Sequence, residues 1–234
     1  MSSEAELKEL SEPSFWDTRY ATAERTNDAT IDSFEWFRSF PKIRPFLEKW
    51  LPSPGGSEVV LHLGCGNSVC VMFTNFQLEI VTDGGPKTLT ADLHEMGYTH
   101  QLSVDFSLVV IDAMRLKYAS LNTTWQVMDV RGLKLDAASV NVAIDQGTLD
   151  AFLHGSLWDP PDDVRENVGK YVDEVARVLK PGGKWLYITY RQPHFMKPLL
   201  TRENEWKLEV EALEDLDGGG EFDYFVFVME RNQN

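Results

Sequence analysis

Two glycines, Gly64 and Gly66, follow the strand-like run Glu58–Leu63 in the stretch EVVLHLGCGNS. A Gly-x-Gly turn placed after a strand lets the backbone come close to a ligand, because glycine has no side chain to keep the ligand away. The same two glycines could serve only to make a tight packing turn. The pattern therefore indicates a candidate ligand-binding turn. The residues around it must be used to distinguish a ligand-binding turn from a packing turn.

The residues after the turn exclude two of the three common ligands of such a loop. A phosphate-binding P-loop needs Gly-Lys-Ser/Thr, whereas Asn67 and Ser68 follow Gly66. A dinucleotide fingerprint needs a third glycine at position 69, which is a valine here. The remaining candidate is a nucleoside without a pyrophosphate, such as S-adenosylmethionine, whose amino-acid part would pass over the turn.

Three aspartates end successive strand-like runs, namely Asp105, Asp129 and Asp145. Because the carboxyl ends of parallel strands meet at one edge of a sheet, we expect all three to face the same crevice. Asp105 is placed to accept hydrogen bonds from ribose hydroxyls, and Asp129 to accept one from an adenine amino group. Taken singly, each acid could instead be a helix cap or a solvated loop residue.

Apolar strand-like runs alternate with helical patterns along the chain. The expected strands are Glu58–Leu63, Gln101–Phe106, Trp125–Val130, Val140–Gln146 and Trp185–Tyr190. Between them, Ser107 is a predicted helix N-cap, and the apolar spacing over Arg165–Leu179 predicts a long amphipathic helix. The KPGG stretch of residues 180–183 is expected to end that helix. Such alternation predicts an α/β fold with a parallel sheet.

The pattern changes near the carboxyl end, where residues 205–230 read as strand, loop and strand, EWKLEVEAL and FDYFVFVME. We interpret this segment as an antiparallel hairpin added to the parallel sheet. Five βα units closed by a hairpin predict a Rossmann-like class I methyltransferase fold in a single domain, residues 1–234. Its mostly parallel seven-stranded sheet would carry helices on both faces.

The segment ahead of the sheet, residues 1–50, is rich in aromatic residues. We expect a helical lid here, in which Trp16, Tyr20 and Trp36 wall a ligand site above the strand ends, where open α/β sheets bind ligands. Packing against the sheet is the alternative role for these aromatic side chains. For Trp50 packing is the expected role.

One segment, Val69–Thr88, interrupts the expected order of strand, turn and helix. An acid that binds ribose normally follows the turn by about 20 residues, whereas Asp105 follows Gly64 by 41. Removal of these twenty residues leaves a spacing of 21. We therefore treat residues 69–88 as an atypical insertion that is poorly packed and weakens cofactor binding. A genuine insertion and a translated intron in the gene model both fit the pattern.

Composition excludes several classes of protein. A formal charge of −15 and a pI near 4.7 disfavour a nucleic-acid partner, which needs clustered Lys and Arg. No apolar run reaches the roughly 18 residues of a membrane span, and the amino terminus does not resemble a signal peptide. Cys65 and Cys70 cannot form a disulfide framework, and no metal-site spacing is present. We expect a cytoplasmic protein.

Several motifs together resemble the eukaryotic lysine methyltransferases that act on translation elongation factor 1A. They include FWDTRY, FEWF, LHLGCGNS, SVDFS, MDVRGL, DQGTLDAF, VARVLKPGGKW and PHF, which span nearly all of Phe15–Phe195. The resemblance implies S-adenosylmethionine as cofactor and elongation factor 1A as protein substrate. With Gly66 of the turn, the implied cofactor contacts are Trp16, Tyr20, Trp36, Gly64, Asp105, Phe106, Asp129, Val130 and Gln146.

Two positions depart from the family pattern, since Phe106 stands where Tyr is common and Gln146 where Lys is common. Neither change forbids cofactor binding, and no side chain identifies itself as a general base. The expected function is S-adenosylmethionine-dependent protein-lysine N-methylation of elongation factor 1A. A small-molecule methyltransferase and a catalytically impaired methyltransferase-like binding protein are the alternatives.

Overall fold

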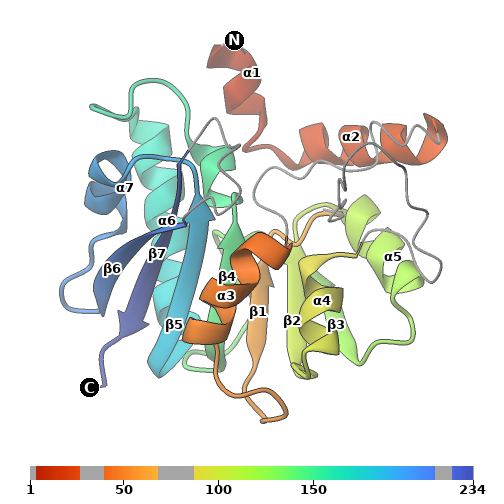
Figure 1. Ribbon diagram of the computed structural model, residues 1–234. Helices are drawn as coiled ribbons and strands as arrows, with labels where there is room; N and C mark the ends of the chain where they lie inside the picture. The colour runs from red at the N-terminus through yellow and green to blue at the C-terminus, as the bar shows by residue number, and fades with distance from the viewer. Residues whose placement is uncertain (1–3, 27–39, 68–86, 214–222, 234) are drawn as a thin grey trace.

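A computed structural model describes residues 4–26, 40–67, 87–213 and 223–233 (Figure 1). A seven-stranded sheet runs through these residues in the order β3-β2-β1-β4-β5-β7-β6. The first five strands are parallel, and β7 is antiparallel to both β5 and β6. The predicted mostly parallel sheet with a carboxyl-terminal hairpin is therefore confirmed. The strands are β1 (Val60–Leu63), β2 (Gln101–Asp105), β3 (Thr123–Val127), β4 (Val140–Gln146), β5 (Leu179–Thr189), β6 (Trp206–Leu213) and β7 (Tyr224–Arg231).

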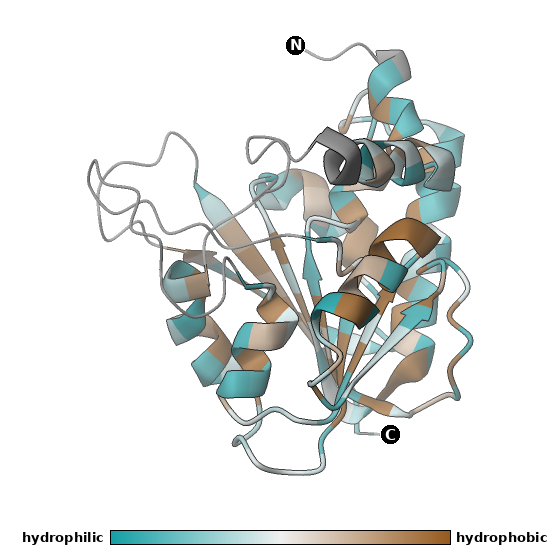
Figure 2. Ribbon diagram, turned by 90° about the vertical axis from the view of Figure 1, so that its right-hand side faces the viewer, coloured by the Kyte–Doolittle hydropathy of each residue, from teal (hydrophilic) through white to brown (hydrophobic). Residues whose placement is uncertain are grey.

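Helices cover both faces of the sheet (Figure 2). On one face, α3 and α4 pack against alternate side chains of β1, β4, β5 and β7. On the other face, α6 and α7 enclose the larger core cluster. The helices are α1 (Glu4–Glu9), α2 (Pro13–Thr26), α3 (Phe40–Trp50), α4 (Leu89–Glu95), α5 (Leu108–Lys117), the 3-10 helix η1 (Leu149–Phe152), α6 (Asp162–Val178) and α7 (Pro193–Leu200). Among the described helices, none is long and apolar enough to cross a bilayer.

The two halves of the aromatic-rich amino-terminal segment lie in different places. In Figure 1, α1 and α2 lie across one end of the sheet, whereas α3 lies along a face of it. Helix α3 buries Ile43 and Leu47, and Trp50 packs against the same core, as expected for that residue. Of the described part of this segment, the residues before 27 lie above the strand ends and α3 does not; Trp36 is outside the described residues.

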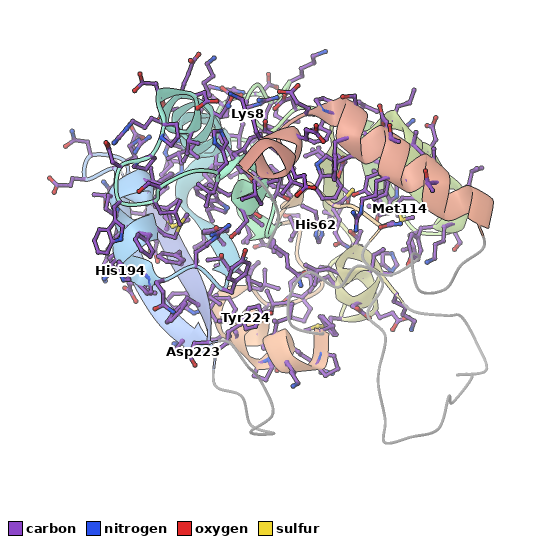
Figure 3. All side chains as sticks on the ribbon, turned by 90° about the horizontal axis from the view of Figure 1, so that it is seen from above. Lys8, His62, Met114, His194, Asp223 and Tyr224 are labelled. Atoms are coloured by element: carbon purple, nitrogen blue, oxygen red, sulfur yellow. The ribbon has the colours of Figure 1, made fainter. Side chains whose placement is uncertain are left out.

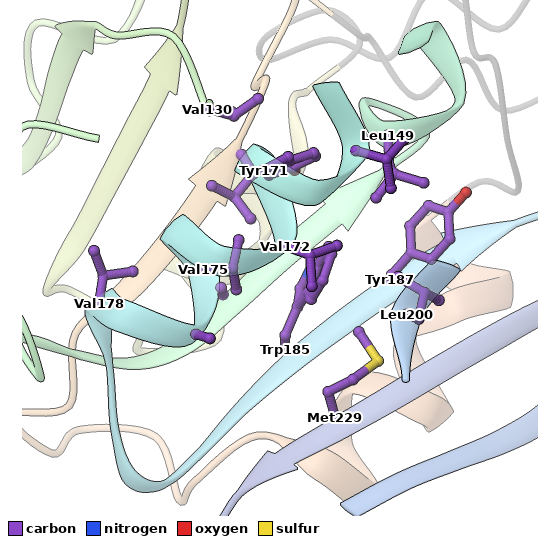
Figure 4. Close-up of a cluster of buried hydrophobic side chains, with 14 of the residues drawn as sticks. Val130, Leu149, Tyr171, Val172, Val175, Val178, Trp185, Tyr187, Leu200 and Met229 are labelled. Carbon is purple, nitrogen blue, oxygen red and sulfur yellow. The ribbon is translucent and has the colours of Figure 1, made fainter. Parts of the chain in front are cut away.

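Helix α6 supplies much of the core, as its apolar spacing predicts. It spans Asp162–Val178, three residues longer at its start than the predicted Arg165–Leu179. Figure 4 shows Val172 and Val175 on the side of α6 that faces Trp185 of β5. All three side chains are fully buried. Positions separated by three or four residues lie on one side of a helix, so the sequence pattern becomes a packed face.

The KPGG stretch does not form a separate turn before the fifth strand. Helix α6 ends before Pro181 as predicted, but β5 begins at once with Leu179 and includes the stretch. Gly182 takes a left-handed conformation with φ of 73°, and the pairing of β4 with β5 shifts register beside it, between Val140 and Val142. The KPGG stretch therefore forms a bulge within the sheet. The spacing of residues in the sequence did not indicate this bulge.

Two hydroxyl side chains begin the helices that follow the first two strands. The Ser107 hydroxyl accepts a hydrogen bond from Val110 N at 3.4 Å and caps α5 as predicted. Thr88, the last residue of the predicted insertion, is buried and caps α4 in the same way. Thr88 is therefore part of the folded domain, because its hydroxyl satisfies a free helix N–H. Residues 68–86 lie outside the described residues, so the rest of the insertion stays a prediction.

Replacement of a buried tryptophan and replacement of an exposed one should have different effects on the stability of this protein. Trp185 is fully buried and its ring lies 5.5 Å from Tyr171 and 5.9 Å from Trp206, whereas Trp158 is 79% exposed. We expect Trp185→Ala to lower the free energy of unfolding by about 3–5 kcal/mol. Trp158→Ala should change it by less than about 0.5 kcal/mol. Urea unfolding followed by circular dichroism measures both, and equal losses would contradict this assignment of the core.

Candidate functional site

A pocket opens at the carboxyl ends of β1, β2, β4 and β5. Seen from above, α2 runs across this end of the molecule (Figure 3). The walls come from α1, α2, the Gly-x-Gly turn, the loops after β2, β3 and β5, and the η1 segment after β4. The lining residues are Leu7, Leu10, Trp16, Arg19, Tyr20, Gly64, Gly66, Asn67, Asp105, Phe106, Val130, Gln146, Gly147, Thr148, Asp150, Ala151, Phe152, Tyr190 and Arg191.

The turn after β1 needs its first glycine for two independent reasons. Gly64 has a φ of 63°, in the region that favours glycine, and a Cβ added there would collide with the side chain of Thr148. Thr148 approaches so closely because its hydroxyl donates a hydrogen bond to the Leu63 carbonyl at 2.8 Å. The turn is therefore packed against the end of β4, and its backbone forms part of the pocket wall.

Asp105 joins the ends of the first two strands. One carboxylate oxygen accepts a hydrogen bond from Ser107 N at 2.9 Å, and the other accepts one from Gly66 N at 3.0 Å. Burial raises the pKa of Asp105 to about 6, although these backbone N–H groups favour the ionised form. Each carboxylate oxygen can accept more than one hydrogen bond. Asp105 can therefore hold the turn and still receive hydroxyl donors from a ligand.

Helix α2 is attached directly above this acid. The Ser107 hydroxyl donates to Asp17 at 2.5 Å, which connects α2 to the start of α5. The Trp16 indole donates to the Leu10 carbonyl at 2.7 Å, and the Trp16 and Tyr20 rings lie 5.8 Å apart. Burial, with the charge of Asp105 as a smaller cause, raises the pKa of Tyr20 well above its usual value. Two aromatic rings of α2 thus line the same pocket as the Gly-x-Gly turn.

The structure brings most of the predicted cofactor residues together. Eight of the ten line the pocket, namely Trp16, Tyr20, Gly64, Gly66, Asp105, Phe106, Val130 and Gln146. Asp129 lies outside the lining set, and Trp36 is not among the described residues. Their proximity shows a shared cavity, and their contact with a cofactor stays a prediction.

Asp129 forms a close ion pair in the structure. Its carboxylate accepts hydrogen bonds from the Arg131 guanidinium, the shortest at 2.6 Å, and from Arg131 N at 2.8 Å. Burial disfavours the charged form, but these hydrogen bonds hold the pKa of Asp129 below its usual value. The strand before it ends at Val127, so Asp129 belongs to the following loop rather than to the strand. An adenine contact would have to use the lone pairs that Arg131 leaves available.

The prediction that Asp145 faces the crevice is wrong. Its side chain is fully buried and accepts hydrogen bonds from Thr148 N at 2.7 Å, Leu149 N at 3.2 Å and the Tyr171 hydroxyl at 2.8 Å. Successive side chains of a strand point to opposite faces, and the next residue, Gln146, lines the pocket instead. Asp145 stabilises the turn into η1, and burial raises its pKa to about 7.

Sequence reasoning missed an acid at the other end of the pocket, Asp150. This carboxylate accepts hydrogen bonds from the Tyr187 hydroxyl at 2.6 Å, the Thr189 hydroxyl at 2.9 Å and Arg191 Nε at 3.2 Å. Burial raises its pKa even so. The available signal was its place in DQGTLDAF, one of the motifs that carried the resemblance. Beside it, the Arg191 guanidinium lies 4.9 Å from the ring of Tyr190.

The helix that normally follows a Gly-x-Gly turn does not contribute to this pocket. None of the described residues of α4 lines it. Thr88, the N-cap residue of α4, donates its backbone N–H to the Tyr118 hydroxyl at 3.1 Å. Tyr118 lies at the end of α5. In the described part of the chain, the turn itself and α2 therefore line the pocket, and α4 does not.

The pocket has two chemically distinct ends. The β1–β2 end combines glycine backbone, a carboxylate and aromatic rings, which suits a nucleoside with free ribose hydroxyls. The β4–β5 end carries the Asp150–Arg191 pair and the half-exposed ring of Tyr190. The described residues contain no cluster of His, Cys, Asp and Glu that could hold a metal ion.

The comparisons with other sequences find similarity to methyltransferases. A family model described as a methyltransferase domain matches residues 84–187. EEF1A lysine methyltransferase 4 of Mus musculus is 34% identical over 184 residues, which cover 77% of this chain and 62% of the relative. The eEF1A lysine and N-terminal methyltransferase of Mus musculus is 28% identical over 81% of this chain and 23% of its own length. The chain thus spans less than two thirds of the length of these curated relatives.

Solved structures decide the fold. A TehB-like S-adenosylmethionine-dependent methyltransferase from Corynebacterium glutamicum superposes with a TM-score of 0.56, at 17% identity, over 92% of this chain and 98% of that one. This is a class I methyltransferase fold. The [4+2]-cyclase SpnF also shares the methyltransferase fold, with a TM-score of 0.59, at 12% identity, over 95% of each chain. The methyltransferase fold therefore does not by itself determine the reaction.

The requirement for glycine at the turn can be tested by substitution. We expect Gly64→Ala to destabilise the protein by at least about 1–2 kcal/mol, because an L-residue is strained at this φ and its Cβ meets Thr148. Gly169→Ala on α6 is the matched control, since a Cβ there meets nothing within 4 Å. Alanine in a helix should stabilise by about 0.5–1 kcal/mol. Thermal unfolding measures both, and a shift of the same sign in the two variants would contradict the assignment.

Proposed function

We propose that this protein is an S-adenosylmethionine-dependent protein-lysine N-methyltransferase that acts on translation elongation factor 1A. One observation carries the proposal: the pocket joins a glycine turn, Asp105 and the aromatic residues of α2 at the strand ends of a methyltransferase fold. The similarity to EEF1A lysine methyltransferase 4 of Mus musculus and Bos taurus supports the choice of substrate.

The residues at the β1–β2 end fit S-adenosylmethionine. Gly64 and Gly66 present bare backbone to the pocket, so the amino-acid part of the cofactor can lie over the turn. Asp105 accepts the ribose hydroxyls, and Val130 offers an apolar surface to the adenine. Trp16 and Tyr20 cover the cofactor from α2 and exclude water. When bound, S-adenosylmethionine supplies an electrophilic methyl group on a sulfonium.

The β4–β5 end then receives the acceptor amine. Methyl transfer needs a neutral lysine amine in line with the donor, so alignment supplies most of the rate enhancement. The Asp150–Arg191 pair fixes the loop after β5 against η1, and Tyr190 lies beside it. We assign these residues to positioning the lysine side chain. The proton that lysine must lose leaves to solvent, and we assign no general base.

The charge of the chain supports a basic protein substrate. Its formal charge is −15, and an acidic surface attracts basic partners and repels nucleic acid. A cytoplasmic location, where elongation factor 1A works, is part of the proposal. A small-molecule acceptor is the first alternative, because the fold does not determine the acceptor. A catalytically impaired binding protein is the second, because residues 69–86 separate the turn from α4 in sequence.

The role of Asp105 predicts a pH-dependent affinity for the cofactor. With a pKa of about 6, Asp105 is ionised above pH 6 and accepts both ribose hydroxyls. As the pH falls below 6 it becomes protonated, and affinity should fall by up to about tenfold per pH unit. Asp105→Asn should bind at least about tenfold more weakly at pH 7.5 and lose this pH dependence. Isothermal titration with S-adenosylmethionine measures both effects.

The control for this variant is Asp112→Asn, which removes a carboxylate whose side chain is 57% exposed on α5, away from the pocket. Its affinity and pH dependence should match those of the wild type. An Asp105→Asn protein that binds with wild-type affinity while remaining folded would remove Asp105 from the cofactor site.

The proposed reaction predicts that the purified protein labels elongation factor 1A. Incubation of a cell lysate with tritiated S-adenosylmethionine should give a labelled protein of that size, and acid hydrolysis should release methyllysine. Purified elongation factor 1A should be labelled as well. Label confined to the small-molecule fraction would favour the first alternative. Absence of cofactor binding in the titration would favour the second, and removal of residues 69–86 should then restore it.

A further inference from the structure

The surface beside the β4–β5 end of the pocket carries an exposed group of aromatic rings, formed by Trp158, His194 and Phe195, which we name the aromatic rim. The Trp158 ring lies 4.9 Å from that of Phe195 and 5.3 Å from that of His194. Trp158 belongs to the loop between η1 and α6, and the other two residues to the first turn of α7. In the view from above, His194 lies at the outer edge of the molecule (Figure 3).

The aromatic rim does not contribute to the core. Trp158 leaves 79% of its surface in water, and among the described large hydrophobic residues only Leu116 is more exposed. A tryptophan side chain left in water forgoes the stabilisation that burial provides. Exposed aromatic groups of this kind are enriched where proteins bind partners.

The aromatic rim is continuous with the pocket along the chain. The loop that carries Trp158 follows Phe152, and α7 begins two residues after Arg191. Phe152 and Arg191 both line the pocket. The aromatic rim therefore borders the end of the pocket assigned to the acceptor lysine, away from the glycine turn.

The chain that follows Trp158 is acidic, which indicates the chemistry of the partner of the aromatic rim. Asp159 follows Trp158 directly; 90% of its side chain is exposed, and it forms an ion pair with Arg165 at 2.7 Å. Asp162 and Asp163 lie in the first turn of α6, and Asp163 pairs with Lys8 at 2.7 Å. Aromatic faces bind Lys and Arg through cation–π interactions, and carboxylates attract the same side chains.

We propose that the aromatic rim is the docking surface for a basic segment of the methyl-accepting protein, which it holds while the target lysine enters the pocket. This inference rests on the proposed function, because it takes the acceptor to be a protein. The occupant is a lysine- and arginine-rich segment that contacts Trp158 with its cationic side chains. The aromatic rim thereby selects a protein acceptor, whereas the pocket binds only the side chain of the target lysine.

Steady-state methylation of purified elongation factor 1A tests the proposal, with Trp158→Ala compared with Leu116→Ala. Both variants remove a side chain about 80% exposed, and only the first alters the aromatic rim. Trp158→Ala should raise KM for the protein about tenfold or more, as for a central interface tryptophan. The value of kcat and the affinity for S-adenosylmethionine should not change. Leu116→Ala should leave KM, kcat and cofactor affinity at wild-type values.

A second variant tests the charge. Asp159→Lys should raise KM at low salt and reduce the salt dependence of KM, because an attractive charge has been reversed. An unchanged KM in Trp158→Ala would overturn the proposal. So would a dimer in gel filtration that Trp158→Ala dissociates with KM unaltered, since the surface would then be a contact between copies of this chain.

Failure of the proposed function gives a different result. In that case the wild type does not label elongation factor 1A, and the aromatic rim is tested by titration of wild type and Trp158→Ala with poly-L-lysine. Weaker binding by the variant would support the docking surface independently of the reaction. Equal binding would overturn it.

Discussion

The position of Asp105 is the constraint on which the pocket depends. Its carboxylate is buried beneath α2 and accepts backbone hydrogen bonds from Gly66 and Ser107. These bonds fix the glycine turn relative to the start of α5, and Ser107 in turn holds α2 through Asp17. One acid therefore couples the turn, the second strand and the covering helix. The desolvation that raises its pKa is also what makes hydrogen bonds to it strong.

Acidic side chains at the other strand ends perform different tasks because their surroundings differ. Asp145 is enclosed by the turn into η1 and by Tyr171, so it stabilises the chain where β4 ends. Asp150 pairs with Arg191 and lies in the pocket wall. Asp129 is neutralised by Arg131 outside the lining set. The same residue type thus supports the fold, shapes the acceptor end, or forms an ion pair.

The fold of this protein determines where ligands bind but not which reaction occurs. A cyclase and a methyltransferase both superpose on it, so the sheet and its helices set only where ligands bind. The choice of reaction depends on the residues around the glycine turn. In our proposal, the choice of acceptor depends on surface features outside the cofactor site, such as Trp158 and Asp159, which a shared fold leaves free to vary. For this reason, more of the lining residues near the glycine turn than near Asp150 could be predicted from the sequence.

The sequence by itself determined the order of strands and helices, the Val140–Gln146 strand to the residue, the Ser107 cap and most residues around the glycine turn. These features depend on periodicity and on short motifs, which neighbouring residues encode. Only the tertiary structure decided that Asp145 is buried outside the pocket lining, that Asp150 lines the pocket and that Trp158 is exposed. The burial of Asp145 and the position of Asp150 depend on which face a residue takes and on partners 26 and 41 residues away, Tyr171 and Arg191. No local pattern specifies such contacts, because packing between distant segments creates them.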